Sequence, residues 1–138
     1  MPFLVMLPLM AQPSGAFCSA AAQRLARKSH AGCDSPDDVK RAIEISAFGA
    51  FLVSQQAAKR MLPENHGAIL LSGATAGVKG FALSATFAMG KFALRGLAQS
   101  MARELSPRGI HVAHFVIDGG IRSAQRPVPA DAPDSLLD

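Results

Sequence analysis

Residues 91–112, KFALRGLAQSMARELSPRGIHV, hold the clearest structural pattern of the chain and decide the fold. Apolar residues recur in them at three- and four-residue steps, which predicts an amphipathic helix from about residue 84 to 105, closed by Pro107. The apolar run GIHVAHFVI, residues 109–117, follows at once and predicts a buried strand. A helix that leads directly into an apolar strand is typical of layered α/β folds.

The same alternation of helix and strand occurs upstream. In DSPDD, residues 34–38, Ser35 can cap a helix, Pro36 suits its first position, and the two following aspartates favour its positive end. One apolar face is then predicted as far as Pro63, formed by Val39, Ile43, Ala47, Ala50, Val53, Ala57 and Met61. GAILLS, residues 67–72, predicts a second strand buried on both faces, so we expect an α/β fold with a parallel sheet.

Composition narrows the classes of function. The chain has 138 residues, 49% hydrophobic and 17% charged, as expected for one globular domain. Its net charge of +4 is scattered and it lacks Trp and Tyr, so we expect no nucleic-acid partner. No long uninterrupted apolar stretch predicts a membrane span. Cys18 and Cys33 have no partners at metal-ligand spacing, and we interpret them as free thiols of a cytoplasmic protein without a metal site.

Three segments are predicted. Residues 1–34 show no clear period and form an unmatched leader that could be loose, with a short helix near 17–28 as its best candidate element. Residues 35–123 form the α/β segment. Residues 124–138 form an acidic, proline-containing tail that we expect to be loose.

The order of the elements resembles a known family. AFGAFLVSQQAAKRMLPENHGAILLSGATAG, followed by FAMGKFALRGLAQSMARELSPRGIHVAHFVIDGGIRS, is similar to the second half of the nucleotide-binding core of short-chain dehydrogenases/reductases, over about residues 41–123. The resemblance implies a fragment of a doubly wound fold: a partial Rossmann-like parallel sheet with two long helices. It also implies NAD or NADP as cofactor and a small carbonyl or alcohol as substrate.

In that family a tyrosine donates a proton to the substrate oxygen. A lysine one helical turn later lowers the pKa of the tyrosine and holds the ribose of the cofactor. Without gaps, the tyrosine position falls on Phe87 and the lysine position on Lys91. Lys91 is therefore the strongest candidate site residue, while a phenyl ring at Phe87 has no proton to give. The competing interpretations are a solvated helix lysine and a packed aromatic ring.

Two further family positions are also replaced here. The serine that hydrogen-bonds the substrate falls on Ala74, which Ser72 and Thr75 flank with hydroxyl groups. The asparagine that orders a water relay falls on Ser46. Ser72, Thr75 and Ser46 are therefore candidate catalytic positions, and each could equally be a structural cap.

The turn after the last strand is a partial match. The family carries Pro-Gly there, followed by an aliphatic residue and a threonine near the nicotinamide amide. This chain has Asp118 and Gly119, then Ile121 and Ser123. The resemblance thus assigns Gly119, Ile121 and Ser123, with Lys91, to cofactor binding.

The glycine-rich cofactor loop of the family lies upstream of the matched region. The 40 residues before the match contain no such loop, so we expect a truncated or frame-shifted member of the family. Gly73, Gly77 and Gly80 imitate the loop, but their spacing is one residue too long. A phosphate-binding role for this stretch stays a minor alternative.

The resemblance implies an NAD(P)-dependent oxidoreductase for carbonyl or alcohol hydride transfer. Because three of four catalytic positions are replaced, we expect a weakly active or inactive protein. The alternative is a non-catalytic fragment that acts through helix-mediated association, including a homo-oligomer. Small residues on the second predicted helix, Gly90, Ala93 and Gly96, would allow such close packing, within the chain or between chains.

Overall fold

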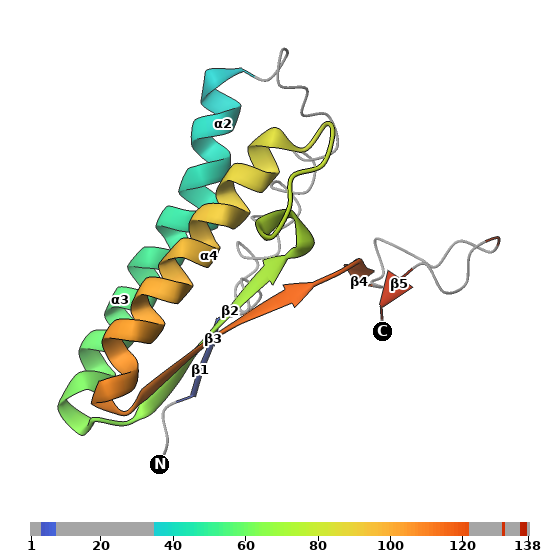
Figure 1. Ribbon diagram of the computed structural model, residues 1–138. Helices are drawn as coiled ribbons and strands as arrows, with labels where there is room; N and C mark the ends of the chain where they lie inside the picture. The colour runs from blue at the N-terminus through green and yellow to red at the C-terminus, as the bar shows by residue number, and fades with distance from the viewer. Residues whose placement is uncertain (1–3, 8–34, 122–130, 132–135, 138) are drawn as a thin grey trace.

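The computed structural model describes residues 4–7, 35–121, 131 and 136–137 (Figure 1). Two long helical segments run side by side against a small parallel sheet. The expected α/β class with a partial Rossmann-like sheet is confirmed. The helix expected near residues 17–28 lies outside the described residues.

The first helical segment consists of three pieces. They are α2 (Pro36–Ile43), the π-helical turn Glu44–Phe48 and α3 (Gly49–Met61). The helix begins as the sequence predicts, because the Ser35 hydroxyl accepts a hydrogen bond of 3.1 Å from the Asp38 amide. Pro36 occupies the first turn.

The predicted apolar face continues beyond the π-helical turn with one exception. Ala50, Ala57 and Met61 are buried as predicted, together with Ser54 and Ala58. Val53, which the uninterrupted period placed on the buried face, is 46% exposed.

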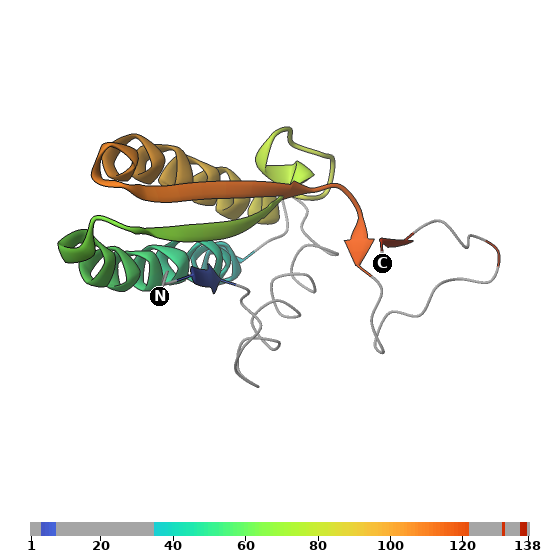
Figure 2. The same ribbon diagram turned by 90° about the horizontal axis from the view of Figure 1, so that it is seen from below.

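The two strands that the sequence predicts are present, and three shorter strands accompany them. β2 (Gly67–Ala74) and β3 (Ile110–Ile117) pair in parallel, with α4 (Ala85–Leu105) between them in the chain. β1 (Leu4–Leu7) pairs in parallel with the other edge of β2, so β2 lies between β1 and β3 (Figure 2). The sequence assigned no strand to residues 4–7. Two short strands, β4 (Gly120–Ile121) and β5 (Leu136–Leu137), form a separate parallel pair.

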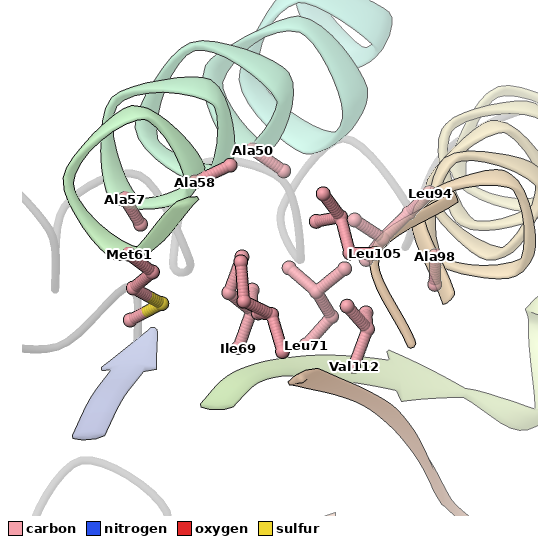
Figure 3. Close-up of a cluster of buried hydrophobic side chains, with 11 residues drawn as sticks. Ala50, Ala57, Ala58, Met61, Ile69, Leu71, Leu94, Ala98, Leu105 and Val112 are labelled. Carbon is pink, nitrogen blue, oxygen red and sulfur yellow. The ribbon is translucent and has the colours of Figure 1, made fainter. Parts of the chain in front are cut away.

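The core lies between the sheet and the two helical segments. Figure 3 shows α3 and α4 on the same side of β2 and β3. Apolar strand residues meet small helix residues there, and the cluster consists of Ala50, Ala57, Ala58, Met61, Ile69, Leu71, Leu94, Ala98, Leu105, Ile110 and Val112. The strands were expected to be buried on both faces, but Phe115 of β3 is 52% exposed, because the described helices cover one face only.

Two neighbouring turns align the strands. Asn65 and Gly109 both adopt left-handed backbone conformations just before β2 and β3, with φ of 48° and 73°. A side chain at Gly109 would collide with the Asn65 carbonyl group, so glycine is required for this close approach. The two strands therefore start together and end together, at Ala74 and Ile117.

Candidate active site

The candidate residues gather at the carboxyl ends of β2 and β3. This edge is where open α/β sheets place their ligands. The 3-10 turn Thr75–Gly77 continues β2, and Asp118 continues β3. The first turns of α4 lie beside the same edge.

Lys91 reaches this edge from α4. Its Nζ atom donates a 3.4 Å hydrogen bond to the carbonyl oxygen of Ser72. Ser72 thus contacts Lys91 through its backbone, whereas its hydroxyl group was the candidate in the sequence. Burial lowers the pKa of Lys91 below the ordinary value of 10.5. An ammonium group has three N–H donors, so this one contact leaves donors for a ligand.

Phe87 lies one turn before Lys91 on α4. The Lys91 Nζ atom is 5.6 Å from the centre of the Phe87 ring, within the range of a cation–π contact. The two side chains therefore lie on the same face of α4. The ring supports the ammonium group but offers no acidic proton.

The loop after β2 is fastened to α4 beside Lys91. The Arg95 Nη1 atom donates a 3.3 Å hydrogen bond to the Gly77 carbonyl oxygen. A Cβ atom on Gly77 would lie 2.9 Å from the carbonyl oxygen of Lys91. One on Gly73 would collide with the imidazole ring of His114. Close packing therefore accounts for both glycines without a phosphate ligand.

His114 lies between the sheet and α4, whereas His111 is exposed on the same strand. The sequence predicted opposite faces for the two, because they are three residues apart on a strand. The Nε2 atom of His114 is buried, with no hydrogen-bond partner among the described residues. Burial, and then the positive charges of Arg95 and Lys91, lower the pKa of His114, so a neutral ring is favoured.

Thr75 and Asp118 join the ends of the two strands. The Thr75 Oγ1 atom is 2.5 Å from Asp118 Oδ1 and 3.4 Å from the Ile117 carbonyl oxygen. The sequence points to both residues but does not predict their contact. Only the register of the parallel strands, which pairs Ala74 with Ile117, brings them together.

The remaining candidates lie around this centre. Ser46 belongs to the π-helical turn and packs against Gly90, where an added Cβ atom would lie 2.9 Å from that of Ser46. Gly119 has a positive φ of 138° in the exposed turn after β3. Ile121 belongs to β4, and Ser123 lies outside the described residues.

The described part of the chain offers two further observations. Its His, Cys, Asp and Glu side chains form no group of three or more that could hold a metal ion. Among its helices, none is long and apolar enough to span a membrane.

Comparison with known proteins identifies the family to which the chain belongs. A family model described as short chain dehydrogenase matches residues 19–126. The chain therefore belongs to the short-chain dehydrogenase family. The match begins well before residue 41, where the resemblance was expected to start.

Individual relatives agree with this assignment. The chain is 38% identical over 79 residues to the 3-oxoacyl-(acyl-carrier-protein) reductase MabA of Mycobacterium avium, covering 57% of this chain and 31% of the relative. It is 37% identical to a short-chain dehydrogenase from Rhodopseudomonas palustris of known structure, with a TM-score of 0.63 and coverage of 64% and 42%. A 4-hydroxyisoleucine dehydrogenase complexed with NADH and succinate matches at 27% identity and a TM-score of 0.64, with coverage of 69% and 41%. The chain thus spans less than half the length of these relatives.

Proposed function

We propose that this chain is an NAD(P)-dependent oxidoreductase of the carbonyl/alcohol type, weakly active or inactive as it stands. The observation that carries the proposal is the position of Lys91, half-buried at the carboxyl edge of the sheet beside Phe87. A bound nicotinamide cofactor would supply or accept the hydride.

The described residues fit one part of such a cofactor. Free N–H donors on Lys91 suit the hydroxyl groups of a ribose. Gly119, Ile121 and Ser123 are proposed to lie near the nicotinamide amide. The choice between NAD and NADP belongs to a segment outside this region, so the proposal covers both. The NADH complex of the 4-hydroxyisoleucine dehydrogenase supports the class of cofactor.

Phe87 is the reason to expect weak turnover. In the reduction of a carbonyl group, a proton must reach the oxygen as the hydride reaches the carbon. A positioned proton donor contributes typically about 10²–10⁴-fold in rate. The phenyl ring of Phe87 has no proton to donate, so it contributes no such rate increase. Lys91 lies beside this ring and therefore has no phenol whose pKa it could lower.

A cofactor titration tests the proposal. Purified chain is titrated with NADPH and NADH while nicotinamide fluorescence is followed. We expect saturable binding that Lys91→Ala weakens and Lys59→Ala, an exposed lysine on α3, leaves unchanged. No saturation up to about 1 mM, which corresponds to only about −4 kcal/mol, would refute the cofactor site.

A second function is supported by a different observation. The first helical segment and α4 expose large apolar side chains, namely Phe48, Phe51, Leu52, Met89 and Phe92, each between 41% and 54% exposed. Such surfaces are typical of interaction sites. A non-catalytic fragment that associates through these helices is therefore the alternative proposal. In both cases a cytoplasmic location remains our expectation.

A further inference from the structure

The hydrogen bonds of Thr75 fix the direction in which its hydroxyl group points. Its Oγ1 atom has two protein partners, Asp118 Oδ1 and the Ile117 carbonyl oxygen. A carbonyl oxygen and an ionised carboxylate can only accept hydrogen bonds. Thr75 must therefore donate its single proton to this pair, and only the lone pairs of its oxygen remain for a third partner.

This polarity decides which substrate group Thr75 can bind. A carbonyl oxygen needs a donor, and the proton of Thr75 is already engaged. An alcohol hydroxyl group can donate to the free lone pairs of Oγ1. At a position next to Ala74, where the family serine would stand, the chain thus favours an alcohol over a ketone or aldehyde.

We propose that Thr75 and Asp118 form a proton relay for the oxidation of a secondary alcohol by NAD(P)⁺. The inference rests on the proposed function and adds to it the substrate group that the site binds and a second pair of residues. Thr75 is the catalytic residue that touches the alcohol, and Asp118 acts through Thr75.

The atoms and electrons of the step balance. A bound NAD(P)⁺, which Lys91 is proposed to hold, would accept the hydride of the alcohol carbon, and the C–O single bond would become a carbonyl bond. The alcohol proton passes to Thr75 Oγ1 while the proton of Thr75 passes to Asp118. Asp118 is exposed, so it can then release the proton to water. The relay replaces the base that Phe87 cannot supply.

The location is consistent with this role. The turn that begins at Thr75 packs against α4, the helix that carries Lys91, and Gly77 of the turn contacts the Lys91 backbone. Thr75 is half-buried, which leaves its oxygen partly accessible. The relay therefore lies at the same edge as the proposed cofactor-binding lysine.

The test uses the full chain with cyclohexanol deuterated at carbon 1 and NAD⁺ or NADP⁺. Deuterium in the reduced cofactor is measured by mass spectrometry. We expect transfer by the wild type, a loss of roughly 10²-fold in Asp118→Asn, and no loss in Asp37→Asn, an exposed aspartate on α2. Thr75→Val should abolish transfer, and Thr75→Ser should recover it relative to Thr75→Val.

Chemical rescue distinguishes a role of Asp118 in proton transfer from a purely structural role. Formate, a small base, should raise the rate of Asp118→Ala and leave the wild type unchanged. NADH and NADPH titrations of each variant separate the two proposals. If the cofactor binds but Asp118→Asn transfers deuterium as fast as the wild type, or if the wild type transfers none, the relay is wrong and the cofactor site stands. If no cofactor binds, the proposed function fails and the relay with it.

Discussion

Lys91 combines a charge with partial burial. Its ammonium group contacts one carbonyl oxygen and the face of one aromatic ring, and burial lowers its pKa below 10.5. The described residues place no carboxylate within ion-pair distance of it. Its charged form is therefore destabilised in the folded chain relative to the unfolded chain.

The burial of Lys91 makes the stability of the chain depend on pH. Between the lowered pKa of folded Lys91 and 10.5, the unfolded chain binds more protons, so the free energy of unfolding rises with pH. Below both pKa values the penalty of burying the charge is fully present. The stability of the wild type relative to Lys91→Met should thus increase in urea denaturation as the pH rises toward 10.5.

Lys59→Met is the matched control, because Lys59 is exposed on α3. Its difference from the wild type should show no such slope. Parallel curves for the wild type and Lys91→Met over the whole range would contradict the burial of the Lys91 charge.

Single residues also mark what the sequence could and could not predict. Lys91 and Phe87 were found because their spacing of four lies within one helix. The bond between Thr75 and Asp118 was missed because 43 residues separate them. Nothing local encodes that contact, which exists only once the ends of β2 and β3 are aligned.

Among the elements, the π-helical turn packs against α4 next to Lys91. Gly90, the residue before Lys91, faces Ser46 and the carbonyl oxygen of Ala42, and an added Cβ atom would lie 2.9 Å and 3.3 Å from them. A helical period in the sequence corresponds to a constant rotation per residue. It therefore predicted the first helical segment but not the π-helical turn within it. The strands and α4 agreed with prediction because their patterns are uninterrupted.

Replacing either of two glycines on α4 by alanine should therefore change the stability of the chain in opposite directions. Gly90→Ala should destabilise the chain by about 1–3 kcal/mol, because the methyl group would overlap Ser46. Gly96→Ala should stabilise it by up to about 1 kcal/mol, since nothing lies within 4 Å and alanine is the better helix former. Urea denaturation of both variants measures the difference, and a destabilising Gly96→Ala or a neutral Gly90→Ala would contradict this packing.

As a whole, the described part of the chain forms part of a doubly wound fold. Strands β1, β2 and β3 lie in chain order with helices on one face, and the family match covers residues 19–126. The sequence predicted this class from alternating elements. It did not predict β1, because Leu4–Leu7 has no periodic context that distinguishes a strand from any short apolar run.

The exposed apolar side chains predict self-association. Replacing Phe48 and Phe92 together by aspartate should weaken association by more than about tenfold in sedimentation equilibrium, since two charges would be buried in an apolar contact. Leu83→Asp, in the exposed loop before α4, is the control and should leave the mass unchanged. A wild type that is strictly monomeric would refute the alternative proposal of helix-mediated association.

We propose that the chain keeps the lysine of a dehydrogenase site and lacks its acid. The most direct measurement is the rate of cyclohexanone reduction by NADPH in the wild type and in Phe87→Tyr, with Phe92→Tyr, an exposed ring on α4, as control. A phenol beside Lys91 restores a proton donor, so we expect Phe87→Tyr to raise the rate by about 10²-fold or more and Phe92→Tyr to have no effect. Equal rates for the wild type and Phe87→Tyr, with NADPH bound in both, would contradict the claim.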